Sequence, residues 1–257
     1  MNDFNWLGLW TLYKREVWRF LKVIHQTLIA PIVTTLLFLA VLSLSAGGRG
    51  GRMVEGIPYS EFLAPGLIMM AIVQNAFANT SSSLMLSKIQ GVIIDLLMPP
   101  LTGSEITFSL TMGGVTRGIL VGIVVALFVY IFIPFSIHHW FAALFYLVFS
   151  SLMLALVGLL TGIWSQSFDQ LSAITNYIIT PLSFLSGTFY SIHQLPDFWY
   201  QTCHFNPFFY MIDGFRYAFT GYADGSIETG MVVICATNIV LWCMAQTLIT
   251  RGYKLKT

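Results

Sequence analysis

The longest stretches of this chain without a charged side chain constrain its fold most. Runs of 26 residues without Asp, Glu, Lys or Arg separate Lys22 from Arg49 and Glu61 from Lys88. A third run, from 118 to 168, is 51 residues long. A helix of about 20 apolar residues crosses the roughly 30 Å hydrocarbon core of a bilayer, so the longest run predicts a hairpin of two such helices. The chain is therefore predicted to be an integral membrane protein.

Composition favours a single membrane domain over residues 1–257. Hydrophobic residues make up 56% of the chain and charged residues 9%, whereas about a quarter of the residues of a soluble domain are charged. The predicted fold class is an all-α integral membrane protein with six transmembrane helices. Charge-free windows place these spans at 27–46, 62–84, 108–133, 141–163, 171–190 and 229–250.

Basic residues predict the orientation of these spans. Six spans place both termini on one side of the membrane. That side receives eight basic residues, and the other side receives Arg49, Arg52 and Arg216. The eight are Lys14, Arg15, Arg19, Lys22, Lys88, Arg251, Lys254 and Lys256. Because cytoplasmic loops are enriched in Lys and Arg, both termini are predicted to be cytoplasmic. The net charge of +1 gives no reason to expect nucleic acid as a partner.

The first 25 residues are predicted to form an amphipathic interfacial helix. Its apolar positions follow helical spacing, with most of the basic residues elsewhere. These positions are Trp6, Leu9, Trp10, Tyr13, Val17, Phe20, Leu21 and Ile24. Such a helix either anchors the chain to the membrane surface or also contacts a partner.

The cytoplasmic loop between the second and third spans carries a second apolar face. Ile89, Val92, Ile93, Leu96 and Leu97 repeat with helical spacing, and Pro99 and Pro100 follow them. A short helix over 88–98 is therefore predicted. Its apolar face would lie on the bilayer or dock into a groove of a soluble motor.

The outer loop between the fifth and sixth spans, 191–221, is predicted to form short helices that enter the outer leaflet and return. Asn206 followed by Pro207 is typical of an N-cap and a first helical residue, and this helix should end before Gly221. Leu195 and Pro196 introduce another short helix. Asp213 and Arg216 lie at i and i+3 and could form an ion pair.

Catalytic motifs are not found in the sequence. It contains no GxSxG, HExxH or GxxxxGKS segment. Cys203, Cys235 and Cys243 have no paired spacing, so neither a disulfide framework nor a zinc site is predicted. A lipid-modifying enzyme and a passive channel remain alternatives to a transport subunit, although no filter-like segment for a channel is visible.

Residues of the outer loop and the second span resemble the signature of ABC-2 type transporter permeases, and the resemblance covers nearly the whole chain. It is closest to small bacterial permeases that include nodulation-factor and drug-export subunits. The residues that carry it are Ser186, Gly187, Phe189, Leu195, Pro196, Asn206, Pro207, Tyr210, Gly214, Phe215 and Arg216, together with residues 64–70.

This resemblance implies a bacterial inner-membrane exporter built from two permease and two ATPase subunits. ATP and Mg would be bound only by the separate ATPase, so no cofactor and no catalytic role are expected in this chain. The second permease would be identical to it, and membrane lipid would surround both. The predicted helix 88–98 would be the coupling helix on the ATPase. Its residues would include Lys88, Ile89, Val92, Ile93, Asp95, Leu96 and Leu97.

The resemblance also places the substrate pathway along the first, second and fifth spans. Polar stripes occur there, with Asn75, Asn79 and Ser82 on the second span and Asn176, Thr180 and Ser183 on the fifth. They would line a pathway for an amphipathic or lipid-like substrate, or only hydrogen-bond between helices. The outer re-entrant helices would form a gate or an aromatic interfacial belt. Their candidate residues are Gly187, Phe189, Leu195, Pro196, Asn206, Pro207, Tyr210 and Arg216.

The third span carries a small-residue face and one charge. Gly114, Gly118 and Gly122 recur every fourth residue, which predicts close helix packing. Arg117 adjoins this face. It is expected near the inner boundary of the membrane, with Asp169 as a candidate partner.

Overall fold

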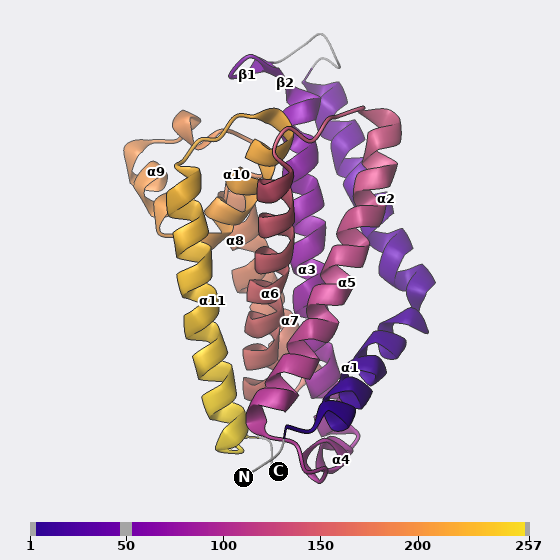
Figure 1. Cartoon of the computed structure of the whole chain (residues 1–257). Helices are drawn as coiled ribbons and strands as arrows, with labels where there is room; N and C mark the ends of the chain where they lie inside the picture. Colours follow the sequence, from indigo (N-terminus) through magenta and orange to yellow (C-terminus); the bar gives the residue numbers. More distant parts are fainter. Residues whose placement is uncertain (1–3, 47–52, 255–257) are drawn as a thin grey trace.

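Long apolar helices form the framework of the molecule (Figure 1). The computed structural model describes residues 4–46 and 53–254. Within these ranges five helices are long and apolar enough to cross a membrane, and each matches a predicted span. They are α2 (Ile24–Ser45), α3 (Tyr59–Ile89), α5 (Gly103–Phe132), α6 (Trp140–Trp164) and α11 (Ile227–Thr250). The described fold is all-α apart from a hairpin of two-residue strands, β1 (Met53–Val54) and β2 (Ile57–Pro58).

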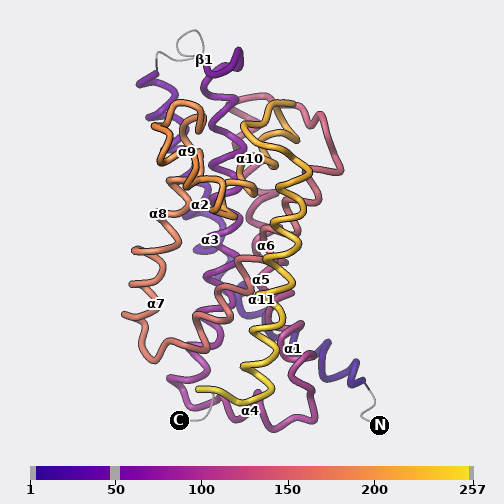
Figure 2. The backbone as a smooth tube through the Cα atoms, turned by 90° about the vertical axis from the view of Figure 1, so that its left-hand side faces the viewer, coloured from indigo at the N-terminus to yellow at the C-terminus, as the bar shows by residue number. Residues whose placement is uncertain are grey.

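The predicted span 171–190 is divided rather than continuous. α7 (Phe168–Ile174), a π-helical turn η2 (Thr175–Ile179) and α8 (Thr180–Leu185) follow one another without a gap. Figure 2 shows this segment rising along one side of the bundle. Pro181 lies in the first turn of α8 and has no N–H to donate to the turn before it. The wider π turn lies directly before this interruption.

The two ends of the bundle carry different short elements (Figure 1). The start of α1 and the end of α11 lie at the same end of the bundle as α4 (Ile93–Leu97), whereas β1, β2 and the short helices after α8 lie at the opposite end. We call these the inner and outer ends, after the predicted orientation. The common position of the start of α1 and the end of α11 agrees with an even number of passes along the bundle.

Helix α3 is the central element. In its most apolar window 78% of the residues are buried, against 17% in α2. The small-residue face of α5 packs against α3 and α6, as predicted. A Cβ added at Gly114 would lie 2.8 Å from the Cβ of Ala155, and one added at Gly122 would lie 2.5 Å from Ile72. Glycine is therefore what allows these helices to approach so closely.

The N-terminal amphipathic helix is α1 (Trp6–Leu21), and α2 begins soon after it at Ile24. Residues 1–3 of the predicted helix lie outside the described residues. Leu9, Leu12 and Phe20 face the protein, whereas Trp6 and Trp10 are exposed. The predicted apolar stripe therefore divides over two surfaces, since part of it packs on α5 and the tryptophans face outward.

The predicted continuous helix over 88–98 is wrong in its extent. Helix α3 continues to Ile89, and Gly91 with a φ of +72° ends it before α4 begins at Ile93. The N–H of Gly91 donates to the carbonyl of Lys88 at 3.1 Å. A left-handed glycine just after a helix is a common termination signal. The sequence pattern therefore belongs to the last turn of α3 and to a separate one-turn helix.

Three short elements form the outer segment between α8 and α11. They are η3 (Ile192–Gln194), α9 (Asp197–His204) and α10 (Pro207–Thr220). The predicted cap is confirmed, because the side chain of Asn206 accepts a hydrogen bond from the N–H of Phe208 at 3.0 Å. Gly221, with a φ of +72°, ends α10 as expected.

Candidate functional site

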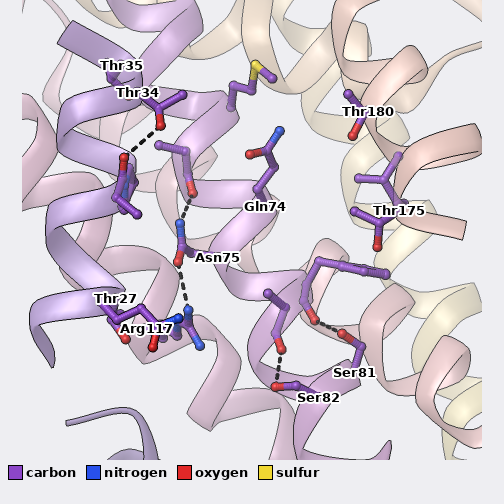
Figure 3. Close-up of a pocket in the computed structure, with 18 of the residues that line it drawn as sticks. Thr27, Thr34, Thr35, Gln74, Asn75, Ser81, Ser82, Arg117, Thr175 and Thr180 are labelled. Carbon is purple, nitrogen blue, oxygen red and sulfur yellow. Dashed lines mark hydrogen bonds between the residues drawn. The ribbon is translucent and has the colours of Figure 1, made fainter. Parts of the chain in front are cut away.

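A cavity of about 780 Å³, lined by both polar and apolar residues, opens between α2, α3 and the α7–α8 segment (Figure 3). One residue of α1 and one of α5 complete its wall. Cavities of roughly 300–1,000 Å³ commonly hold small-molecule ligands. These walls are the first, second and fifth predicted spans, which are the helices that the resemblance assigns to the substrate pathway.

Four of the six predicted pathway residues line this cavity: Asn75, Ser82, Asn176 and Thr180. Ser183 does not line it, because this side chain is fully buried and its hydroxyl donates to the carbonyl of Ile179 at 2.8 Å. The hydroxyl of Ser82 donates to the carbonyl of Ala78 at 2.5 Å. The polar stripe on the fifth span is thus shared between the cavity and local helix hydrogen bonds.

Asn79, the sixth predicted residue, is bound by α1 instead of lining the cavity. Nη2 of Arg19 donates to its Oδ1 at 3.0 Å and to its backbone carbonyl at 2.7 Å. Nε of Arg19 also lies 3.3 Å from Oε2 of Glu16, whose side chain is fully buried. A Cβ added at Gly113 would lie 2.7 Å from the Cβ of Glu16, so this glycine makes room for the buried carboxylate.

Arg117 lies half-way along α5, in the cavity wall. Its Nη2 donates to Oδ1 of Asn75 at 3.1 Å, an interaction drawn in Figure 3. Its Nε is buried and has no hydrogen-bond partner among the described residues. Asp169, the expected partner, is exposed, and within the described ranges no carboxylate lies within 4 Å of Arg117.

Several polar residues of the cavity were not predicted. They come from α2, α3 and η2 and include Gln26, Thr27, Thr34, Thr35, Gln74, Ser81 and Thr175, several of which Figure 3 shows. Thr34 and Thr35 follow Thr27 by seven and eight residues, which places all three on one face of a helix. This spacing was visible in the sequence and could have identified α2 as a wall.

The inner end carries the surface predicted to contact an ATPase. Ile93 and Leu96 are buried in a hydrophobic cluster with Leu12 of α1. They therefore pack α4 against the bundle and leave its opposite face exposed. Nζ of Lys88 donates to the carbonyls of Gly162 and Ser165 at 2.9 and 3.2 Å. Lys88 thus closes the end of α6 and is not free for a partner. The residues left exposed are Ile89, Val92, Ile94, Asp95 and Met98, while Leu97 is half-buried.

At the outer end, Arg216 joins α10 to α3 and to the turn after α8. Its side chain is 1% exposed. It donates from Nη2 to the carbonyl of Gly187 at 2.5 Å and from Nε to the carbonyl of Phe62 at 3.3 Å. Its guanidinium also lies 3.8 Å from the centre of the Phe62 ring. Gly187 has a φ of +73°, which places its carbonyl in a conformation that glycine adopts readily.

Two carboxylates balance this buried arginine. Asp213 lies 3.8 Å and Asp224 3.9 Å from Nη1 of Arg216, which confirms the predicted i, i+3 pair. Burial raises the pKa of Asp213 to about 6, although Arg216 acts in the opposite direction. Burial also raises the pKa of Tyr222, whose hydroxyl donates to Oδ1 of Asp224 at 2.8 Å. The cluster holds α10 in place through mutually satisfied charges.

The other predicted outer residues divide between core and surface. Nδ2 of Asn206 donates to Oγ of Ser186 at 2.8 Å, and the hydroxyl of Tyr210 donates to the carbonyl of His204 at 3.1 Å. Pro207 is half-buried at the start of α10, and Leu195 is also half-buried, whereas Pro196 is exposed. The ring of Phe189 lies between Phe38 and Phe184, with centroids 6.1 and 5.4 Å away. Of the aromatic side chains of α9 and α10, Phe198 and Trp199 are exposed, whereas Phe208, Phe209 and Tyr210 are buried.

Membrane-length helices around a cavity with polar and apolar walls are the architecture expected of a membrane transport subunit. Comparison with known proteins agrees with this class. The model of the ABC-2 type transporter family matches residues 8–220. The inner membrane transport permease YadH of Escherichia coli K12 is 37% identical over all 257 residues of both chains. Nodulation protein J of Rhizobium leguminosarum bv. viciae is 26% identical, over 96% of this chain and 94% of its own length.

The chain belongs to the ABC-2 type transporter family. It is a multi-pass inner-membrane permease and a non-catalytic component of the transporter. Such permeases work with a separate ATPase, which binds and hydrolyses ATP. The cavity therefore lies in the subunit that provides the route across the membrane.

Proposed function

We propose that this permease exports an amphipathic or lipid-like substrate, with the cavity between α2, α3 and the α7–α8 segment as part of the route. The single observation that carries this proposal is the mixed lining of the cavity. Phe38, Leu67 and Met70 line it together with polar residues of the same helices. A substrate with both an apolar and a polar part would satisfy both kinds of lining. The similarity to the inner membrane transport permease YadH supports the transport function itself.

A second, identical permease would complete the pathway. Helix α2 has many exposed apolar side chains, among them Val33, Leu37 and Val41, and Tyr177 and Ile178 of η2 are also exposed. These elements flank the cavity, so a second copy placed against them would close its open side. Six crossings, cytoplasmic termini and re-entrant α9 and α10 belong to the same proposal. The α7–α8 segment would be the fifth crossing.

Two copies of an ATPase would dock at the inner end, one on each permease. The contact would be the exposed face formed by Ile89, Val92, Ile94, Asp95 and Met98. We call this face the α4 surface. Its apolar residues lie at the end that is predicted to be cytoplasmic, and Ile93 and Leu96 fix it to the bundle core. An ATPase that binds the two arrangements of the permease pair with different affinity would couple hydrolysis to transport.

Co-purification tests this function. The chain would be expressed with the ATPase encoded beside it and purified by a tag on the permease alone. The expected result is ATPase activity in the purified sample, and its loss in the Ile94→Asp variant. The matched control is Tyr253→Asp, which introduces the same charge at an exposed aromatic residue near the inner end of α11. A permease that purifies without ATPase activity would contradict the proposal and favour an enzyme or a channel.

A further inference from the structure

The charges in the cavity wall are all of one sign. Among the described residues that line the cavity, Arg19 and Arg117 are charged and none is Asp or Glu. Glu16 compensates Arg19 from outside the cavity at 3.3 Å. Among the described residues, Arg117 has only the neutral amide of Asn75 as a hydrogen-bond partner. An uncompensated cation between membrane helices is costly, so the wall is better suited to a ligand that brings a negative charge.

The unused bonding capacity of Arg117 points in the same direction. Its Nε is buried without a hydrogen-bond partner in the described part of the chain. A guanidinium offers its N–H groups as a planar fork that matches carboxylate and phosphate oxygens. Asn75 accepts from Nη2, so the guanidinium retains donors without a partner among the described residues, and a small side-chain movement would bring the buried Nε to an acidic group. In Figure 3 Arg117 lies beside Thr27 and below Gln74, in the part of the cavity nearer the inner end.

The opposite part of the cavity is more apolar. Phe38 on α2 and Leu67 and Met70 on α3 are the lining residues of these helices closest to the outer end. The residues between them and Arg117 are mostly threonines and amides, including Thr34 and Gln74. Along α2 and α3 the wall thus changes from cationic, through neutral polar, to apolar, whereas the α7–α8 segment has Leu171 toward the inner end and Thr180 toward the outer end.

We propose that the cavity binds an anionic amphiphile, with its acidic headgroup on Arg117 and its apolar tail directed toward Phe38, Leu67 and Met70. This inference rests on the proposed export of an amphipathic substrate and adds the charge and the direction of that substrate. A phosphate or carboxylate headgroup would receive hydrogen bonds from Arg117 and polar contacts from Thr27. A neutral lipid would leave the guanidinium uncompensated, and a zwitterionic lipid would bring a cation together with its phosphate to a wall that already carries Arg19 and Arg117.

Direct binding tests the inference without the ATPase. The full-length permease would be purified in a neutral detergent and titrated with dioctanoyl phosphatidic acid, dioctanoyl phosphatidylcholine and inorganic phosphate. We expect phosphatidic acid to bind about tenfold or more tightly than either other probe, since a hydrogen bond to a charged group is commonly worth a factor of that order. Equal affinity for the two lipids would overturn the claim that an acidic headgroup is recognised. Equal affinity for phosphatidic acid and inorganic phosphate would overturn the claim that the apolar tail contributes to binding.

Variants assign the binding to Arg117. Arg117→Gln should weaken phosphatidic acid about tenfold and leave phosphatidylcholine unchanged, while Arg117→Lys should retain part of the preference. The control Arg251→Gln removes an exposed charge at the end of α11, outside the cavity, and should have no effect. An unchanged preference in Arg117→Gln would overturn the assignment. If that variant does not fold, the comparison of lipids on the natural chain still decides the inference. If the permease shows no preference for phosphatidic acid but still co-purifies with ATPase activity, the anionic-substrate inference is wrong and the proposed export function stands.

Discussion

Arg19 of α1 donates two hydrogen bonds to Asn79 of α3, at 3.0 Å to the side chain and 2.7 Å to the backbone carbonyl. Glu16, on the buried face of α1, forms an ion pair with the same guanidinium, with Oε2 3.3 Å from Nε. The amphipathic helix is therefore attached to the helix that forms one wall of the cavity. A displacement of α1 at the inner end must either carry α3 with it or break this contact.

Replacing Arg19 should destabilise the fold through Glu16. Arg19→Gln leaves a fully buried carboxylate with Arg15 as its remaining cation. Loss of one partner of a buried pair is expected to cost about 2 kcal/mol here, since Arg19 is partly exposed. The measurement is the Tm of the purified protein in detergent. Arg15→Gln is the control and should lower the Tm less, and an equal decrease would contradict this account.

Replacing Arg216 should destabilise the outer segment more strongly. Arg216→Lys keeps the charge but cannot reach the carbonyls of Phe62 and Gly187 together with two carboxylates. We expect a loss of about 3 kcal/mol, seen as a lower Tm and lower yield. The same exchange at the exposed Arg251 should be neutral. A stable Arg216→Lys variant would show that the fork geometry is dispensable.

Replacement by alanine should affect stability differently at Gly214, within α10, and at Gly221, which ends this helix. A Cβ at Gly214 would lie 1.9 Å from the Tyr146 ring, whereas a Cβ at Gly221 would meet nothing within 4 Å. Gly214→Ala should therefore prevent normal packing of α10 on α6. Gly221→Ala should cost only about 1 kcal/mol, because its φ of +72° is unfavourable for alanine. Tm values of the two variants in one detergent test this order, and similar values would contradict it.

Neighbouring isoleucines of α4 should separate folding from docking. Ile93 is 5% exposed and Ile94 is 59% exposed. Ile93→Asp places a charge in the inner core and should reduce stability by about 3 kcal/mol or more. Ile94→Asp should leave the Tm unchanged. Size-exclusion profiles after heating compare the two, and a destabilised Ile94→Asp variant would mean that α4 packs differently in solution.

Local chemistry made part of this structure predictable from sequence. The Asn206–Pro207 start of α10, its end at Gly221 and the glycine face of α5 depend on a few adjacent residues or on helical spacing. The length of charge-free runs likewise identified five long apolar helices. Division of the span 171–190 was less accessible, because a single Pro181 is compatible with a kink, a break or a π turn.

Other features depended on contacts between distant segments. The periodicity of Ile89 to Leu97 suggested one helix, but the left-handed Gly91 divides it, and Ile93 turned inward. Glu16 and Arg19 read as ordinary members of a polar helix face. The burial of Glu16 follows from the space left by Gly113, nearly 100 residues away in sequence, which no local pattern indicates.

The sequence by itself determined that this chain crosses a membrane, which helices are long enough to do so, and to which family it is similar, because hydrophobic length and local signals act within each segment. Only the tertiary structure decided which polar residues meet at the cavity. Asn75 lines the cavity, whereas Asn79, one helical turn later, is bound by Arg19. The physical reason is that a polar side chain between membrane helices takes whichever partner the packing supplies.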